Sequence, residues 1–524
     1  MSVIKSAITV SVFTFLSRIL GFIRECLFTA FLGVSAVLDC FLVAVRLANT
    51  CRKIFAEGAF NASFLPRFSS VLETKSIEEA NTLLSKVFSL MLVFVSIFCI
   101  LIIILYPNFL YIIASGFKSS KEQFDMAVTL GRITFPFLLF VSLTALFCGV
   151  ANASKKFALP AIIFSSVNVF SIFTVSICHF CGYSVEENIF YISIGVLASG
   201  IFQVVVMYYY VLHLGYKIKF TIIFFSKDVN SILKNMVPGI IGAGVWQINM
   251  LIDMQVCSYL PAGTISCISF ADKLNQFPLA TIGTAIGTAL LPTLSASISK
   301  KDFKAANGDL QTGILFAMLF AIPAFIVLFS LAQPIVSCAY ERLKFSSEHV
   351  IIVSETLRGF AIGLPAYILA KIFSSAFFAN RDTVTPIKCA MLSVFANIVF
   401  LITLVPLGRI FCVPLSTALS AWVNVISLGF LLFKRYRFNL NLIFLKRFFI
   451  QVTSGVILFF EMTYICNTFW NPIFGESYYK WIYTCVFGII SLISYFSFIS
   501  FFMFALREQN IKFWKISSWT VSVK

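Results

Sequence analysis

Apolar runs about 20 residues long recur along the whole chain, for example VFSLMLVFVSIFCILIIILY at 87–106. A helix of about 20 apolar residues crosses the roughly 30 Å hydrocarbon layer of a bilayer. Only helices and closed barrels satisfy their backbone hydrogen bonds in lipid. The runs lack the alternation of apolar and polar residues that barrel strands show, and only 12% of residues are charged. We therefore expect an all-α polytopic membrane protein.

Charged residues, prolines and glycines divide this apolar sequence into about fourteen predicted transmembrane helices. The first run, MSVIKSAITVSVFTFLSRILGF, resembles a signal peptide, but Arg18 interrupts it and no small-residue cleavage site follows. We interpret it as a retained helix. The predicted spans are residues 5–32, 36–65, 83–114, 126–152, 157–180, 188–213, 232–259, 263–294, 307–338, 351–379, 384–406, 412–433, 446–470 and 479–506.

The loops between these spans carry an uneven charge. If the N-terminus is cytoplasmic, one side holds most of the loop lysines and arginines, and the C-terminal tail adds four more. The opposite side holds only Lys118, Lys121, Arg342, Lys344, Arg409 and Lys480. Cytoplasmic loops of membrane proteins are enriched in Lys and Arg, so we predict that both termini are cytoplasmic. The net charge of +17 then reflects orientation in the membrane and does not indicate nucleic-acid binding.

The chain also resembles itself. IFAEGAFNASFLPRFSS near Pro66 aligns with TIGTAIGTALLPTLSAS near Pro292, and 131–160 aligns with 357–386. Both pairs are about 226–228 residues apart and run in the same direction. We predict two parallel six-helix repeats plus two C-terminal helices, with lobes at 1–220 and 221–440 and the added pair at 441–524. Parallel repeats indicate two lobes with a substrate site at the repeat interface.

Reactive constellations are missing from the sequence. The 14 cysteines lie mostly inside apolar runs, and we expect them to be small core residues without disulfides. No GxxxxGK[ST] phosphate-binding loop occurs, and the three histidines have no supporting cluster. Neither ATP hydrolysis nor a nucleophile–base set nor a metal site is indicated. We predict a transporter and not an enzyme, without a cofactor, driven by a monovalent cation, a proton or the membrane potential.

Charged residues concentrate in the first two predicted spans. A charge at the centre of a bilayer costs about 2.5–3.5 kcal/mol on insertion scales. Interfacial anchoring or internal salt bridges are one explanation, which stays open for Arg46 and Lys53. For Arg18, Arg24 and Arg52 a basic, water-filled cavity is the sharper hypothesis, because guanidinium groups bind phosphate through two parallel hydrogen bonds. The set comprises Arg18, Arg24, Asp39, Arg46, Arg52, Lys53 and Glu57.

Two further positions follow from the repeat and from isolated charge. Lys273, beside Asp272, occupies the position that corresponds to Arg46 in the other repeat. It would bring positive charge from the second lobe, or form a neighbour pair with Asp272 at an interface. Asp253 is a lone acid in an apolar span. It is a candidate for cation or proton coupling, with pairing to a lysine or polar neighbour as the alternative.

Four segments of the chain resemble the MurJ (MviN) family of lipid II flippases, within the multidrug/oligosaccharidyl-lipid/polysaccharide exporter superfamily. They are SRILGFIRECL (17–27), LDCFLVAVRLANTCRKIFAEGAFNASFLP (38–66), FADKLNQFPLATIGTAIGTALLP (270–292) and FFANRDTVTPIK (377–388).

The resemblance implies a role for several of the residues above. Arg18, Arg24 and Arg52 match basic cavity residues that engage the lipid-linked pyrophosphate, and Asp39 and Glu57 match acidic positions nearby. Lys273 stands where the family commonly has Arg, so the planar fork is lost there. The two C-terminal helices match a pair that forms a groove for the polyprenyl tail.

The expected function is therefore translocation of undecaprenyl-pyrophosphate-linked disaccharide-pentapeptide from the cytoplasmic to the outer leaflet of the bacterial inner membrane, by alternating access. The expected partners are lipid II, the phospholipid bilayer and other cell-wall synthesis proteins. A flippase for another polysaccharide-lipid and a drug or cation antiporter remain alternatives, although a cation carrier should line its cavity with acids. A non-transporting scaffold for cell-wall synthesis is the alternative of a different class.

Overall fold

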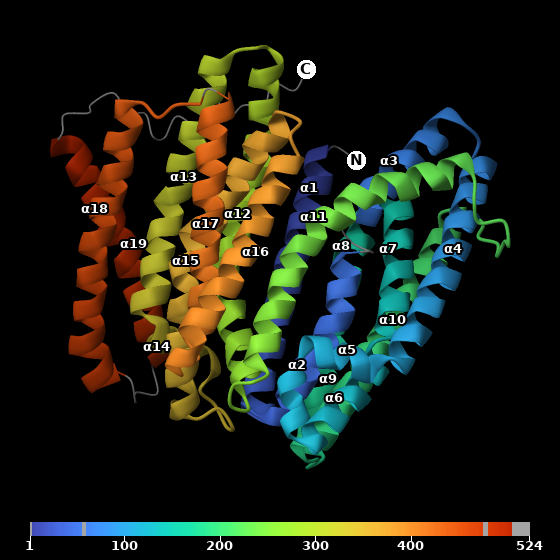
Figure 1. Ribbon diagram of the computed structural model, residues 1–524, viewed down its shortest axis with the longest axis horizontal. Helices are drawn as coiled ribbons and strands as arrows, with labels where there is room; N and C mark the ends of the chain where they lie inside the picture. The colour runs from blue at the N-terminus through green and yellow to red at the C-terminus, as the bar shows by residue number, and fades with distance from the viewer. Residues whose placement is uncertain (1–2, 55–58, 437, 475–479, 506–524) are drawn as a thin grey trace. The chain divides into compact units, whose positions relative to one another are not determined.

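The computed structural model describes residues 3–54, 59–436, 438–474 and 480–505, and within these ranges every regular element is helical (Figure 1). The elements are α1 (Val3–Leu32), α2 (Ala36–Cys51), α3 (Ala59–Thr74), α4 (Ile77–Ile104), α5 (Tyr106–Ile113), η2 (Ser115–Ser119), α6 (Lys121–Thr134), α7 (Phe137–Ala153), α8 (Ala158–Ile162), η3 (Ile163–Ser165), α9 (Ser166–Phe180), α10 (Val185–His213), α11 (Lys227–Cys257), α12 (Thr264–Ser299), α13 (Phe303–Ser330), α14 (Ala332–Tyr340), α15 (Ser347–Ala379), α16 (Val384–Leu404), η4 (Val405–Leu407), α17 (Cys412–Tyr436), α18 (Leu442–Ile465), the π-helical η5 (Cys466–Phe474) and α19 (Lys480–Ala505).

Ten helical segments of the described chain are long and apolar enough to cross a membrane. This confirms the predicted all-α polytopic class, and the count of about fourteen spans stays a prediction. The predicted span 36–65 corresponds to two described helices, α2 and α3, on either side of residues 55–58, which lie outside the described residues. The predicted span 83–114 is divided within the described residues: α4 ends at Ile104, Leu105 caps it, and α5 begins at Tyr106 with a proline in its first turn.

Side-chain caps fix where many of these helices begin. Ser35, Ser76 and Ser226 each accept a hydrogen bond from the backbone N–H three residues ahead. Ser184 forms a capping box with Glu187 at the start of α10. Such caps satisfy N–H groups that have no partner within the helix. At the other end of α10, Gly215 adopts a left-handed conformation with φ of 90° and reverses the chain.

The chain forms two compact units, which are described separately. Unit 1 comprises residues Met1–Ala271, Ala339–Thr356 and Ala390–Ser416, and unit 2 comprises Asp272–Cys338, Leu357–Cys389 and Thr417–Lys524. The predicted lobe boundaries near residues 220 and 440 stay predictions.

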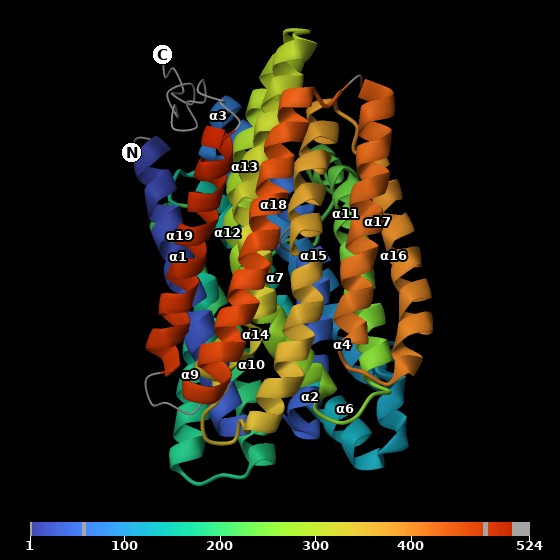
Figure 2. The ribbon, with the colours of Figure 1, turned by 90° about the vertical axis from the view of Figure 1, so that its left-hand side faces the viewer.

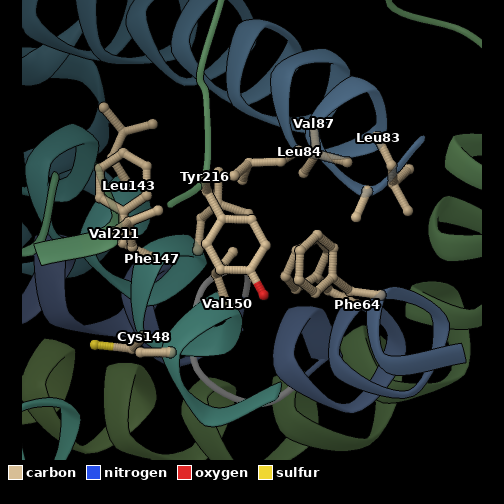
Figure 3. Packing of buried hydrophobic residues seen from close by; sticks show 14 of the residues in the cluster. Phe64, Leu83, Leu84, Val87, Leu143, Phe147, Cys148, Val150, Val211 and Tyr216 are labelled. Atoms are coloured by element: carbon tan, nitrogen blue, oxygen red, sulfur yellow. The ribbon is translucent and has the colours of Figure 1, made fainter. Parts of the chain in front are cut away.

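The core of unit 1 is built where α3, α4, α7 and α10 meet. Phe64 and Phe68 stack along α3, with ring centroids 5.2 Å apart, and Phe68 lies 5.9 Å from the ring of Tyr216. Phe147 of α7 and Val211 of α10 complete the cluster with Tyr216 (Figure 3). Tyr216 is 5% exposed, and its hydroxyl pairs with that of Ser154 at 2.8 Å. This core holds the segment that follows α10 against α3 and α7.

The core of unit 2 contains α13, α18 and α19, the last two of which run side by side (Figure 2). Gln451 on α18 donates to the backbone carbonyl of Leu315 on α13 at 3.0 Å. One turn further on, a Cβ added to Gly455 would lie 2.6 Å from Ile322 of α13. A small residue at this crossing lets the two backbones approach closely, as is common between helices in membranes.

Equivalent contacts recur in the two halves of the sequence. Within unit 1, the Nε of Arg132 donates to the carbonyl of Ile103 near the end of α4, at 3.1 Å. Within unit 2, the Nε of Arg358 donates to the carbonyl of Phe329 near the end of α13, at 3.2 Å. Donor and acceptor are both displaced by 226 residues. The left-handed residues after α7 and α15 also recur at this spacing (φ 60° and 59°), which supports the predicted duplication.

Candidate functional site

Arg24 lies two-thirds of the way along α1 and is largely enclosed, with its side chain 21% exposed. One terminal nitrogen donates to Oδ1 of Asn168 on α9 at 3.0 Å, and the other forms an ion pair with Glu25. The guanidinium carbon also lies 5.6 Å from the ring centre of Phe28. Among the described residues, the buried Nε has no hydrogen-bond partner. The group is therefore held in place while retaining an unused donor.

Local sequence explains how Asn168 reaches this site. Gly21 lies one turn before Arg24, and a Cβ added there would come within 3.6 Å of the Asn168 amide nitrogen. That amide nitrogen donates to the carbonyl of Ser17 at 3.4 Å while its oxygen accepts from Arg24. Asn168 therefore bridges two turns of α1 and orients the guanidinium.

The other predicted basic residues of unit 1 occupy different surroundings. Arg18 is half-buried on α1, and it makes no hydrogen bond or ion pair within the described part of the chain. Arg52 follows the last turn of α2 and donates from Nε to Asn49 of the same helix at 3.2 Å. Arg46 points at the sulfur of Met250 on α11, at 3.6 Å. The contacts described here for Arg24 are with α1 and α9, and the hydrogen bond from Arg52 to Asn49 is with α2.

Asp39 is almost fully buried, at 2% exposure, and contacts the start of α12. Its carboxylate accepts from the backbone N–H of Gly263 at 2.6 Å, and from the N–H of Ser266 at 2.7 Å and its hydroxyl. Gly263 immediately precedes α12 and Ser266 lies in its first turn, where N–H groups lack partners within the helix and the dipole favours negative charge. Asp39 therefore caps α12 from α2. Glu57, the other predicted cavity acid, lies outside the described residues.

Asp253, the candidate for ion coupling, faces a polar neighbour in unit 1. The amide nitrogen of Asn397 on α16 donates to its Oδ1 at 2.7 Å. Asn397 is fully buried, and its own amide oxygen has no hydrogen-bond partner within the described chain. The geometry matches the predicted alternative of a polar partner, and the coupling role stays a prediction.

The predicted positions in unit 2 lie on α12. Lys273 is exposed, and Asp272 accepts a hydrogen bond from Gln276 at 2.6 Å, one turn along the same helix. Lys371 on α15 is a further exposed lysine inside a predicted span, and its Nζ would lie 3.2 Å from a Cβ added to Gly283. A lysine inside the predicted span 351–379 could have been identified from the sequence as a candidate cavity residue, and it was not.

One side chain outside the spans has a well-defined electrostatic setting. Asp382 caps α16 through the N–H of Thr385 at 3.0 Å, and also accepts from Arg435 and the Tyr436 hydroxyl. Desolvation by burial would raise its pKa, but the hydrogen bonds from Thr385 and Tyr436 and the charge of Arg435 outweigh it and lower the pKa. Asp382 is therefore a structural loop residue.

Unit 1 also contains a polar pocket of about 640 Å³ at the end where α11 meets α12. Asp39, Lys118, Gln123 and Ser258 are among its lining residues. None of the predicted arginines lines this pocket, so it is separate from the surroundings of Arg24.

The described chain combines many apolar helices with charged side chains inside predicted spans, and this combination is typical of membrane transporters. Ionisable residues inside membrane segments mark substrate and ion pathways, and the structure is that of a polytopic membrane transporter. A family model described as "Lipid II flippase MurJ" matches residues 28–484. The chain belongs to the MurJ family of lipid II flippases.

Curated relatives agree over most of the chain. The "Probable lipid II flippase MurJ" of Rickettsia prowazekii is 34% identical over 470 residues, which cover 89% of each chain. The protein of the same description from Rhizobium tropici is 31% identical over 94% of this chain and 92% of its own. The "Lipid II flippase MurJ" of Burkholderia cenocepacia is 30% identical over 89% of this chain and 90% of its own.

Solved structures give the same assignment. A structure described as "Lipid II flippase MurJ, inward closed conformation" is similar with a TM-score of 0.78 and 27% identity, over 95% of this chain and 99% of that one. An inward-facing multidrug transporter of the MATE family and MOP superfamily is similar with a TM-score of 0.62 and 12% identity, over 80% of this chain and 94% of its own. The second likeness concerns the fold alone.

Proposed function

We propose that this chain translocates lipid II from the cytoplasmic to the outer leaflet of a bacterial inner membrane by alternating access, and that both of its termini are cytoplasmic. Membership of the lipid II flippase family and the excess of basic residues in one set of predicted loops support the proposal. The protein makes and breaks no covalent bond in this account. Other proteins of cell-wall synthesis are candidate partners.

The observation that carries the substrate assignment is the state of Arg24. A guanidinium inside a predicted span needs charge or hydrogen-bond partners. Here one neighbouring carboxylate and one amide provide them, while the buried Nε has no hydrogen-bond partner among the described residues. A pyrophosphate offers several oxygens to a planar fork of donors. We propose that the headgroup competes with Glu25 for the guanidinium.

The remaining basic residues extend this proposal. Arg18, one and a half turns before Arg24, makes no polar contact within the described chain and supplies a second guanidinium on α1. Arg52 and Lys273 supply further positive charge. The ammonium group of Lys273 is a point charge and cannot form the two parallel hydrogen bonds that a guanidinium forms with a phosphate. Asp39, Glu57 and Asp272 are proposed to shape the surrounding field, with Asp39 also serving as a helix cap.

We propose that the membrane potential or an ion gradient drives the cycle, because the sequence contains no phosphate-binding loop for a nucleotide. Asp253 is the proposed position for a coupling proton or monovalent cation. Its buried partner Asn397 has an amide oxygen without a hydrogen-bond partner in the described residues, so the pair offers two kinds of oxygen within a short distance.

A depletion experiment in cells tests the proposed function. Cells that depend on this chain are depleted of it, and a toxin that cleaves lipid II is added from outside. We expect cleavage to fall, because lipid II no longer reaches the outer leaflet. Cleavage that stays at the undepleted level would defeat the flippase assignment.

Variants in the same cells test the residues. Arg24→Ala and Arg52→Ala should abolish complementation at normal membrane abundance. Lys75→Ala is the matched control: Lys75, in the turn between α3 and α4, forms an exposed ion pair with Glu79 in the first turn of α4, and such surface pairs contribute little to stability. Full complementation by both arginine variants would show that these residues do not contact the substrate.

A further inference from the structure

The segment that joins α10 to α11 is extended, and it is fixed to unit 1 at both ends. We call residues 214–226 the connector. It begins with a reversal at Gly215, after which Tyr216 enters the core of unit 1 (Figure 3). It ends at the N-cap Ser226, and Asp228 in the first turn of α11 forms an ion pair with Arg67 of α3. The connector is therefore held at both ends by buried or paired side chains.

Between these ends, the connector runs along α4 and is bonded to it by a ladder of hydrogen bonds. Three alternate backbone N–H groups donate to side chains of α4 that are four residues apart. Side chains four apart on a helix advance by about 6 Å, and alternate residues of an extended chain advance by about 6.6 Å, so the two repeats match. The pairs, donor first, are Lys217–Asn81, Lys219–Ser85 and Thr221–Ser89, with distances of 3.0, 3.0 and 2.9 Å.

The ladder carries the connector into the predicted hydrocarbon zone. Ser89 is twelve residues after Ile77, the first residue of α4, which is about 18 Å along the helix. It is also six residues, or about 9 Å, inside the predicted span that begins at residue 83. Beyond it, α4 exposes large apolar side chains that include Phe94, Ile97 and Ile104. The connector therefore runs beside a helix whose outer surface suits lipid.

The side chains of the connector have the composition of a membrane-interface segment. Phe220, Ile222, Ile223 and Phe225 are 58%, 82%, 70% and 61% exposed. Contiguous exposed apolar groups of this size mark an interaction surface. Two lysines of the connector, Lys217 and Lys219, and Lys227 at the start of α11 accompany them on the side predicted to be cytoplasmic, where anionic lipids concentrate.

We propose that the connector is a membrane anchor: its aromatic and aliphatic side chains insert at the boundary between headgroups and acyl chains, and its lysines bind anionic phospholipid headgroups. The ladder makes this insertion compatible with an extended backbone, because it satisfies the N–H groups of Lys219 and Thr221, which lie beside the predicted span and would otherwise face an apolar environment. The anchor thus holds the chain between α10 and α11 at the membrane surface from which α4 begins. It does not depend on the proposed lipid II site.

Depth-dependent quenching tests the insertion. The full chain is placed in bilayer nanodiscs made with lipids brominated near the upper part of the acyl chain. Quenching by the brominated lipid is measured for Ile222→Trp and for the parent, which has six native tryptophans. The difference between the two reports the tryptophan at position 222. The controls lie on α4: Ile77→Trp, at the 50% exposed start of the helix, and Phe94→Trp, at a 72% exposed position deep in the span.

We expect the tryptophan at position 222 to be quenched by brominated lipid as the one at position 94 is, and to be shielded from aqueous iodide. If it instead behaves as the one at position 77 does, with iodide quenching and little lipid quenching, the connector lies in water and the proposal is wrong. The role of the lysines is tested by comparing lipid quenching at position 222 in nanodiscs with and without phosphatidylglycerol. The double change Lys217→Gln and Lys219→Gln should abolish any increase in quenching that the anionic lipid produces. An unchanged increase would show that these lysines do not bind anionic headgroups.

Hydrogen exchange tests the ladder separately. The double change Ser85→Ala and Ser89→Ala should raise exchange at the amides of Lys219 and Thr221 by at least tenfold, and Ser96→Ala, seven residues further along α4, should leave it unchanged. Equal exchange in all three proteins would show that the ladder does not hold the connector.

Discussion

Removal of the Asp39 carboxylate should open the first turn of α12. The carboxylate accepts from two backbone N–H groups and one hydroxyl, and it is 2% exposed. An unsatisfied buried donor costs about 1–3 kcal/mol, and loss of an N-cap costs about 0.5–2 kcal/mol. The alanine variant no longer bears the free-energy cost of burying a charged carboxylate, and this offsets part of the lost stability. We expect Asp39→Ala to destabilise this turn by about 3 kcal/mol, which is roughly a 100-fold increase in its open population.

Graded variants sharpen this prediction. Asp39→Asn keeps one carbonyl oxygen and loses the charge and one acceptor, so it should cost less than Asp39→Ala. Ser266→Ala removes only the hydroxyl and should cost the least, at about 1 kcal/mol. Hydrogen exchange of the amides at residues 263–266 in the purified protein measures the series directly.

Two outcomes would refute the reasoning about Asp39. Unchanged protection of residues 263–266 in Asp39→Ala would show that the cap does not stabilise α12. A loss of transport with unchanged protection would instead support the role as a cavity acid that the family resemblance implies.

Two further predictions concern unit 2. Gly455→Ala should destabilise the contact of α18 with α13 by about 1–3 kcal/mol because the new methyl group meets Ile322 at 2.6 Å, whereas Gly488→Ala, with nothing within 4 Å, should be neutral; thermal melting in detergent compares the two. The lowered pKa of Asp382 means that its contribution to stability is present above the ordinary Asp pKa and is lost as the pH falls through the lower folded-state pKa. Hydrogen exchange at Thr385 should rise as the pH falls in this range, after correction for intrinsic rates, and Asp382→Asn should abolish that dependence.

Much of the fold could be predicted from the sequence because lipid restricts the options. Long apolar runs in lipid must be helical, and the repeat was visible as similarity at a spacing of about 226 residues. The caps at Arg132 and Arg358, which recur at this spacing, were not predicted, since their acceptors are backbone carbonyls on another helix. The division of 83–114 at Leu105 was also missed, because hydrophobic periodicity alone does not show where one helix ends and the next begins.

The candidate site was less predictable, since its contacts join distant parts of the chain. The partner of Arg24 on α9 is 144 residues away. Its other partner, Glu25, is adjacent in sequence but was not considered, because neighbouring residues on a helix do not normally face each other. The capping role of Asp39 depends on Gly263 and Ser266, more than 220 residues away, and no local pattern around Asp39 indicates it.

The most direct measurement of the central claim is lipid II movement in vesicles that contain the purified chain, with labelled lipid II loaded in one leaflet and its appearance in the other measured under an imposed membrane potential. The account predicts transfer by the parent chain and by Lys75→Ala, a loss of at least tenfold in Arg24→Ala, and partial recovery in Arg24→Lys, which restores charge without the planar fork. Equal transfer by the parent and Arg24→Ala would contradict the account.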